Sequence, residues 1–225
     1  VLNNAYKELG MYLYIDENSF NYLNSTSIYN NPGNFVNTII GQKDPDAVNI
    51  FITENANPPG SSVGTVLGFY NPNGDYIIIR NQDVQNTSSS LTHELGHFFS
   101  LPHTFFGWEG VYAFYGWTTP QGGITPWNVD QFNGMWTSST AGGSQVLAEV
   151  MDQSNCTAAA DRICDTPPDY NFGLGQNTCS WPNTLRDRNG DVIDPQENNI
   201  MSYFGDCDFV FSQGQIDVMM ADYNS

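Results

Sequence analysis

The residues best suited to chemistry in this chain of 225 residues are its three histidines, which all lie in the stretch HELGHFFSLPH. If that stretch begins as a helix, His93 and His97 lie one turn apart on the same face, so both imidazoles can point at one atom. His103 follows beyond a bend favoured by Pro102 and can return as a third ligand. Three neutral imidazoles with one open position form the ligand set of a catalytic zinc ion, whereas a structural zinc site is closed by four ligands.

Glu94 directly follows the first histidine and supplies the acid–base group that such a site needs. An H-E-x-x-H pattern on its own occurs by chance and is only suggestive. Here the third histidine, the lack of any other histidine and the strand-like residues before the motif all support a metal site. The alternative is a helix with two surface histidines and an unrelated third.

The composition excludes several classes of function. Six Lys and Arg against 24 Asp and Glu give a formal net charge of −18, which argues against nucleic acid and anionic membranes as partners. Only 13% of the residues are charged, while Asn, Ser, Thr and Gly are abundant, as in secreted proteins. No apolar run approaches the ~20 residues that span a bilayer. We therefore expect a secreted, extracellular, monomeric protein, with any targeting segment or pro-segment lying upstream of this sequence.

The four cysteines all fall in the last third of the chain. An even number in a loop-rich part of a secreted-looking protein indicates two disulfides, for which three pairings are possible. We favour Cys156–Cys164, which would close a small loop, and Cys179–Cys207, which would tie the C-terminal half to the segment around Met201. The alternative is free, buried thiols.

Sequence patterns predict a mixed α/β lobe over about residues 1–100. We expect helices at 3–9 and 35–40, strands at 11–15, 47–53, 64–70 and 75–80, and a motif helix capped by Thr87 or one of Ser88 to Ser90. Residues 104–148 are rich in Trp and Gly and predict an irregular region, in which some aromatic side chains could line a substrate cleft. Residues 212–222 predict a last helix capped by Ser212, with Ile216, Met219 and Met220 on one face.

Four segments, in one order along the chain, resemble the pappalysin family of metzincin metallopeptidases. They are HELGHFFSLPHTF (93–105), CDTPPD (164–169), NIMSYFGDC (199–207) and FSQGQ (211–215). The third histidine also has the metzincin spacing, H-E-x-x-H-x-x-G-x-x-H. The resemblance covers most of residues 75–220 and is loose over the first 70.

Three features depart from the family pattern: Ser100 replaces the usual Gly, Ser202 stands where Asp is common, and a long aromatic insertion precedes Cys156. The Gly permits a left-handed turn that brings the third histidine back to the metal. A non-Gly residue in that conformation costs roughly 1 kcal/mol. The departure therefore leaves the ligand in place and makes the geometry of the turn a question for the structure.

The resemblance implies a metzincin-like α/β (α+β) fold as a single catalytic domain over residues 1–225. An N-terminal lobe with a twisted mixed sheet and the active-site helix (about 1–100) and an irregular C-terminal lobe ending in a helix (about 101–225) would flank a cleft. It implies a zinc endopeptidase that acts on proteins or peptides. Zinc lowers the pKa of its water, and Glu94 serves as general base and then acid. Met201 would form an apolar floor beneath the histidines, and the Tyr203 hydroxyl would stabilise the oxyanion.

The resemblance also implies calcium near the CDTP segment, with oxygen ligands from Asp161, Asp165, Thr166 and either Asp152 or Glu149. Acidic loops are otherwise more often solvated turns.

Asp206 could sit in the pocket for the residue after the scissile bond and favour a basic side chain there. The alternative for this residue is an exposed turn.

Two other functions are open on sequence alone. A metal-stabilised binding module without activity would predict a damaged Glu or a missing ligand, and neither is seen. A zinc hydrolase of a non-peptide amide is disfavoured by Met201 and Tyr203, although only an assay separates it from a peptidase.

Overall fold

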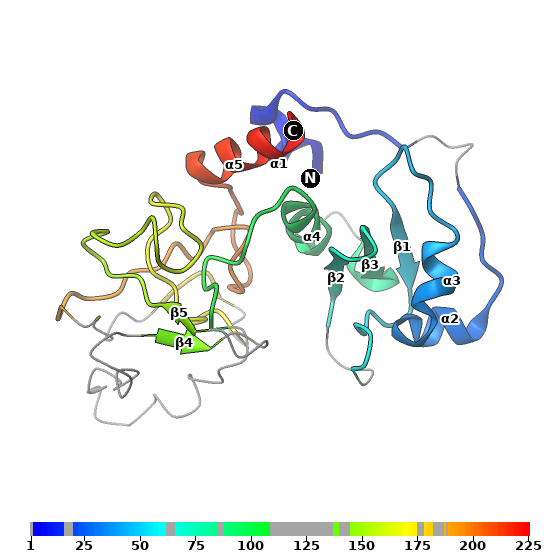
Figure 1. Ribbon diagram of the computed structural model, residues 1–225, viewed down its shortest axis with the longest axis horizontal. Helices are drawn as coiled ribbons and strands as arrows, with labels where there is room; N and C mark the ends of the chain where they lie inside the picture. Colours follow the sequence, from blue (N-terminus) through cyan, green and yellow to red (C-terminus); the bar gives the residue numbers. More distant parts are fainter. Residues whose placement is uncertain are drawn as a thin grey trace. The chain divides into compact units, whose positions relative to one another are not determined.

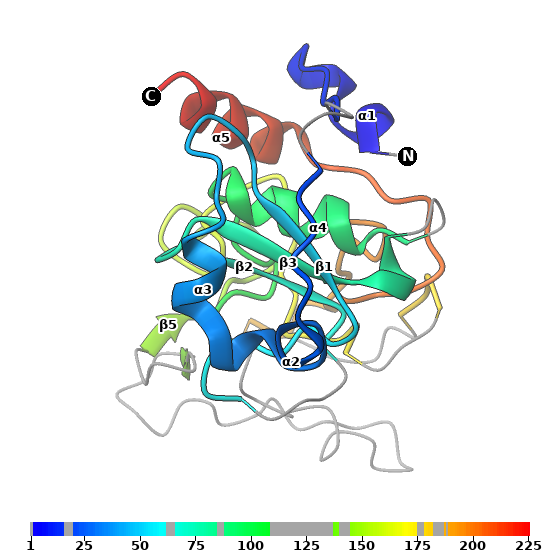
Figure 2. The ribbon, with the colours of Figure 1, turned by 90° about the vertical axis from the view of Figure 1, so that its right-hand side faces the viewer.

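The computed structural model describes residues 2–15, 20–61, 66–84, 88–108, 137–139, 145–174, 178–181, 187 and 189–225. The chain divides into two compact units, Val1–Ser100 with Ser225, and Leu101–Asn224. The first unit combines helices with a mixed sheet, and the second is largely irregular and ends in a helix (Figures 1 and 2). The expected α+β class is therefore confirmed. None of the helices in the described part of the chain is long and apolar enough to cross a membrane.

A three-stranded sheet of order β1-β3-β2 organises the first unit. The central strand β3 (Tyr76–Arg80) runs parallel to β1 (Ile50–Thr53) and antiparallel to β2 (Gly68–Asn71). The residues YIII of β3 are all buried, as expected for a strand that is covered on both faces. The short strand β2 forms one edge of the sheet.

Helices cover both faces of this sheet (Figure 1). On one face lie α2 (Thr26–Asn30) and α3 (Val36–Ile40), and they enclose a core of Ile28, Ile39, Ala56, Tyr76 and Ile78. The other face, to which Ile77 and Ile79 point, packs against α4 (Ser90–Phe98), which contacts β2 and β3. The sheet therefore supplies a rigid support for the helix that carries the histidine motif.

The N-terminus of the chain packs on α4. Helix α1 (Leu2–Ala5) is followed by a 3-10 turn, Lys7–Leu9, so the helix expected at 3–9 is broken into two short pieces. Between them Tyr6 is fully buried, and its hydroxyl donates a hydrogen bond to the carbonyl of Thr92 at 2.8 Å. This hydrogen bond connects the N-terminal segment to the first turn of α4.

The strand expected at residues 11–15 does not form. Its side chains Tyr12, Tyr14 and Ile15 are exposed, and the backbone N–H and carbonyl of Leu13 bond to the Asn3 side chain instead of to a strand. The prediction rested on β propensity, which reflects packing in a sheet and does not create a partner strand. The strands expected at 47–53 and 75–80 form in shortened versions, as β1 and β3. The strand expected at 64–70 is observed as β2, Gly68–Asn71, and its first two positions lie outside the described residues.

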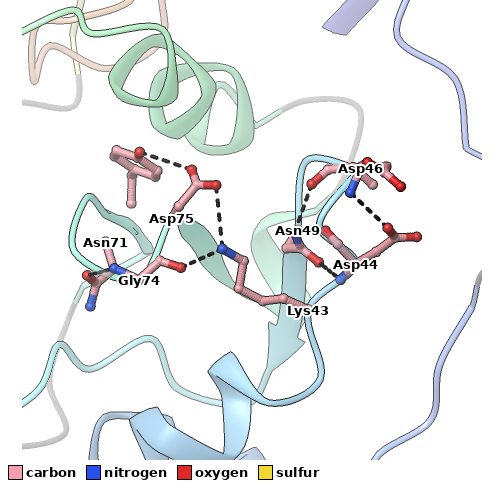
Figure 3. Close-up of polar contacts among 9 residues, drawn as sticks. Lys43, Asp44, Asp46, Asn49, Asn71, Gly74 and Asp75 are labelled. Carbon is pink, nitrogen blue, oxygen red and sulfur yellow. Dashed lines mark hydrogen bonds and ion pairs between the residues drawn. The ribbon is translucent and has the colours of Figure 1, made fainter.

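A polar cluster fixes the turn between β2 and β3 (Figure 3). The ammonium of Lys43 donates to the Gly74 carbonyl at 2.7 Å and lies 3.4 Å from a carboxylate oxygen of Asp75. The Asn71 side chain accepts from the Gly74 N–H, which closes the turn. Within the turn, Asp75 has a left-handed φ of 51°. On the neighbouring loop, the Asn49 side chain accepts a hydrogen bond from the Asp44 N–H.

The second unit has little regular structure. Strands β4 (Thr137–Ser139) and β5 (Gln145–Leu147) form an antiparallel pair, and two disulfides join Cys156 to Cys164 and Cys179 to Cys207. These are the pairs favoured from the sequence. Aromatic side chains dominate the core, which contains Phe105, Trp108, Ala148, Tyr170, Phe172, Trp181, Ile193 and Phe204. Trp117, Trp127 and Trp136, which belong to the Trp-rich stretch 104–148, lie outside the described residues.

The last helix, α5 (Gln213–Tyr223), begins with the expected cap. The Ser212 side chain accepts from the Gln215 N–H, and the Gln215 side chain accepts from the Ser212 N–H, which makes a capping box. Of the predicted apolar face, Ile216 and Met219 are buried and Met220 is half-buried.

Candidate metal centre

The helix α4 ends where the sequence requires a turn toward the third histidine. The N–H groups of Phe99 and Ser100 donate to the carbonyls of Leu95 and His97, which completes the last turn. Ser100 then takes a left-handed φ of 66°, the conformation expected of the glycine usual at this position. The N-cap is Ser89, one of the expected candidates, but its side chain makes no capping hydrogen bond.

The three histidines gather their ring nitrogens at one place. Their nearest ligand atoms all lie within 4.8 Å of one another, and this is the only such group of three or more His, Cys, Asp or Glu side chains in the described part of the chain. The rings of His93 and His97 have centroids 4.9 Å apart and are nearly perpendicular. Tetrahedral Zn–N bonds place nitrogens roughly 3.4 Å apart, so closing on an ion requires movements on the order of 1 Å. The three residues fit a zinc ion with one open position.

Glu94 is buried beside the first histidine, with 7% of its surface exposed. Its Oε2 accepts a hydrogen bond of 2.8 Å from the backbone N–H of Tyr70 in β2. Burial raises the pKa of the Glu94 carboxyl to about 8, although the bond from Tyr70 acts in the opposite direction. A carboxyl held by the backbone and shifted toward neutrality has the properties of a general acid–base group.

His103 is held in the second unit by its neighbours along the chain. Its ring stacks on Phe105 with centroids 4.4 Å apart and an interplanar angle of 12°. The adjacent Thr104 donates its N–H to the Met201 carbonyl at 3.2 Å and its hydroxyl to Asp169 at 3.0 Å. The loop that carries the third histidine is therefore attached to two of the other resemblance segments.

Met201 lies at the centre of this attachment and is fully buried. Its N–H donates to the Asn199 side chain at 2.8 Å, and Ser202 Oγ donates to the Asn199 carbonyl, so the turn around Met201 is closed locally. Asn199 also exchanges two hydrogen bonds of 3.0 Å with Gln215. The start of α5 thus fixes the turn that supports the His103 loop.

Tyr203 lies close to His103. Its ring centroid is 5.0 Å from that of His103 and 4.5 Å from that of Phe105, and 40% of the residue remains exposed. Gly173 packs directly on the backbone of Tyr203 and Phe204, where a Cβ atom would collide with both. The tyrosine is therefore accessible while its backbone is tightly supported.

The residues expected to bind calcium are only partly brought together. Asp161 is buried and accepts from the Thr166 hydroxyl and the Ile163 N–H. Asp165, in contrast, accepts from Ser212 and Gly214 at the start of α5, and Asp152 accepts from Ser154 and Asn189.

Glu149 is buried near Asp161, with 1% of its surface exposed, and its Oε1 has no hydrogen-bond partner among the residues that the structure describes. Burial, with a smaller contribution from the charge of Asp161, raises the pKa of Glu149 to about 8. Burial likewise raises the pKa of Asp161 to about 7. Asp206 is exposed and has a left-handed φ of 55°.

Several supporting residues were not identified from the sequence. Asp169 accepts from Thr104 and from the Phe172 N–H, and burial raises its pKa to about 6. Asn199 and Gln215 lie inside two of the segments that resemble the pappalysin family, but no role was assigned to either residue from the sequence. The bond from the Tyr70 N–H could not be predicted from the sequence, because a backbone donor does not depend on the type of side chain.

The segment that contains the three histidines matches the sequence profile of a known protein family. Residues 47–112 match the sequence profile of Peptidase_M43, described as pregnancy-associated plasma protein-A. No curated protein sequence matches the chain.

Two solved structures resemble the chain at 20% sequence identity. Mature mirolysin of Tannerella forsythia in complex with a cleaved peptide matches over 76% of this chain and 50% of that chain, with a TM-score of 0.40. Mirolysin in complex with compound 9 matches over 77% and 51%, with a TM-score of 0.42. The chain thus spans about half the length of either matched chain. The segment 47–112 contains all three histidines and Glu94, so the similarity to the Peptidase_M43 profile covers the candidate metal ligands and the acidic residue beside them.

Proposed function

We propose that residues 1–225 form the single catalytic domain of a secreted zinc endopeptidase. The observation that carries this proposal is the convergence of His93, His97 and His103 within 4.8 Å, with Glu94 buried directly beside the first ligand. Two disulfides support an extracellular location, since such bonds persist in oxidising compartments. Proteins or peptides are the proposed substrates, and the family match supports this class.

The three imidazoles would hold the zinc ion. When bound there, zinc would polarise the peptide carbonyl, acidify the attacking water and favour the ionised form of Glu94 by its charge. Glu94 takes a proton from the attacking water and delivers it to the leaving amine. Tyr203, exposed beside His103, donates a hydrogen bond to the developing oxyanion. Met201 supports the His103 loop through its carbonyl bond to Thr104.

The decisive experiment combines metal analysis with a peptidase assay. The purified chain should contain one zinc ion and cleave casein or a quenched peptide, and 1,10-phenanthroline should abolish cleavage until zinc is restored. Glu94→Gln should keep the zinc and lose at least roughly 1000-fold in kcat, whereas Tyr203→Phe should lose roughly 100-fold. An unchanged rate in Glu94→Gln would refute the acid–base role. Bound zinc without cleavage of any peptide would support the binding-module or non-peptide alternatives instead.

We further propose that Asp206 favours a basic residue after the scissile bond. It is exposed, its charge has the required sign, and it lies three residues after Tyr203. A peptide series that differs only at this position should show the highest kcat/KM for Arg or Lys, and Asp206→Asn should reduce that preference. Equal preference in the wild type and the variant would rule out this role.

We also propose a calcium ion near the CDTP segment, with Glu149 and Asp161 as its acidic ligands. The support is the buried Glu149 Oε1 without a partner, which a cation would satisfy. Asp165 and Asp152 already accept bonds from other groups, so we leave them out of this ligand set. Added calcium should raise the melting temperature of the wild type but not that of Glu149→Gln. An equal response in both proteins would exclude the site.

A further inference from the structure

One backbone N–H of the edge strand β2 points away from its partner strand β3. The register pairs Tyr70 with Ile77, and the Arg80 N–H bonds to the Leu67 carbonyl. In an antiparallel pair, residues alternate between those that bond to the partner strand and those whose N–H and C=O face outward. Leu67, Phe69 and Asn71 therefore bond to β3, and the Tyr70 N–H lies on the outer edge.

That outward donor is used by Glu94. The distance from Tyr70 N to Glu94 Oε2 is 2.8 Å, and the carboxyl is buried, so the bond is shielded from competing water. A bond to a charged acceptor in such a place is stronger than a neutral one. It occupies Oε2 and leaves Oε1 for proton transfer.

Gly68 makes the room that this arrangement needs. A Cβ atom at this position would lie 3.2 Å from Glu94 Cγ and 3.1 Å from both the Ile78 carbonyl oxygen and Ile79 Cδ1. These contacts are too close for a side chain unless its neighbours shift. Since the Ile78 carbonyl belongs to the central strand, the groups that would have to give way are the side chains of Ile79 and Glu94.

The position of β2 is in turn fixed at its far end. The Tyr70 hydroxyl donates to Asp75 at 3.2 Å, and the Tyr70 ring packs edge-on against Phe98 of α4 with centroids 5.9 Å apart. Asp75 and the Gly74 carbonyl are bound by Lys43, as described for the turn (Figure 3). The strand is thus connected both to α4 and to the loop before β1.

We propose that β2 is the positioning strand of Glu94, with the Tyr70 N–H as the donor that orients the carboxyl and Gly68 as the residue that admits it. The inference rests on the proposed role of Glu94 as the acid–base group. It assigns Gly68 and Tyr70 to catalysis through Glu94, not through contact with the reacting atoms.

The test removes the donor without removing a bond of the sheet. Tyr70→Pro deletes the N–H at a position where it does not bond to β3, so a proline is tolerated there. Tyr70→Ala is the matched control, because it loses the same side chain and keeps the N–H. We expect kcat of Tyr70→Pro to be roughly 10–100-fold below that of Tyr70→Ala, the range for a hydrogen bond to a charged group, with KM and zinc content equal. Equal kcat values would overturn the proposal.

Gly68→Ala provides a second test that keeps the backbone donor. We expect it to lower kcat at constant KM and zinc content, whereas Gly41→Ala, whose Cβ would meet only ordinary contacts of 3.4 Å or more, should behave like the wild type. A loss that appears only in zinc content or KM would show a structural role and overturn the proposal.

Hydrogen exchange separates this inference from the proposed activity. The Tyr70 amide should be protected in the wild type and exchange faster in Glu94→Ala, whether or not any peptide is cleaved. Unchanged exchange would overturn the positioning role. If the Tyr70 amide is protected in the wild type and Glu94→Gln keeps full activity, the proposed function is wrong while the contact between Tyr70 and Glu94 remains.

Discussion

Replacing Asp165 by alanine tests what this residue of the CDTP segment does. The structure makes it an anchor for α5, because its two carboxylate oxygens accept from Ser212 Oγ and from Gly214 N–H, each at 2.8 Å. The family resemblance instead makes it a calcium ligand. The two roles predict different dependence on calcium.

The magnitude follows from the contacts. A hydrogen bond to a charged group contributes about 1.5–3 kcal/mol, and the Gly214 N–H is exposed enough for water to replace part of its bond. The negative charge at the start of α5, a helix of 11 residues, adds about 0.3–1 kcal/mol. Because Asp165 is exposed and water competes for both bonds, we expect Asp165→Ala to lower the free energy of unfolding by about 1–2 kcal/mol and the melting temperature by roughly 2–8 °C.

Calorimetry in zinc-containing buffer, with and without added calcium, measures this effect. If Asp165 is an anchor, the variant is less stable than the wild type by the same amount in both buffers. A matched control is Asp217→Ala on the same helix. Its exposed carboxylate accepts from the Gln213 side chain, and its loss should change stability by less than about 0.5 kcal/mol. A difference between wild type and Asp165→Ala that appears only with calcium would refute the anchor.

Three further outcomes are expected. Ser100→Gly should raise the melting temperature by about 1–2 °C. Relief of the strained left-handed backbone stabilises the folded protein by about 0.5 kcal/mol more than the added flexibility of glycine stabilises the unfolded chain. A melting temperature below that of the wild type would show that Ser100 is held by favourable contacts. Gly173→Ala should cost about 1–3 kcal/mol and reduce kcat, since the new methyl group meets the backbone of Tyr203, and wild-type stability and rate would contradict this packing. In calcium-free buffer the wild type should lose stability as the pH rises from about 5 to 8, because burial raises the folded-state pKa of Glu149 to about 8, of Asp161 to about 7 and of Asp169 to about 6, so their deprotonation is harder in the folded protein. Glu149→Gln should make that decline in melting temperature shallower, and parallel curves for the two proteins would show that Glu149 does not contribute to it.

The features that could be predicted from sequence are those set by short spacings. His93 and His97 share a helix face because four positions make about one turn, and Ser212 caps α5 through Gln215 only three positions away. Both arrangements need no knowledge of the rest of the fold. The strand expected at residues 11–15 failed for the opposite reason, because a strand exists only when another segment bonds to it.

Contacts between distant positions were also beyond the sequence. The Tyr70 N–H reaches Glu94 across 24 positions, and every residue has a backbone N–H, so residue type gives no signal. The pair of bonds between Asn199 and Gln215 depends on α5 returning to the turn around Met201. Amide side chains occur throughout this chain, and only the fold selects these two.

The contacts around the candidate metal ligands explain why a serine can stand at the turn after α4. Ser100 must hold a left-handed φ of 66°, which costs roughly 1 kcal/mol for a residue other than glycine. The bonds that follow this turn offset that cost, since Thr104 is bound by both the Met201 carbonyl and Asp169. Because His103 lies immediately before Thr104, the direction of the third ligand is set by where Thr104 is bound as well as by the turn. The position of His103 is therefore fixed both by the left-handed turn at Ser100 and by the bonds of Thr104.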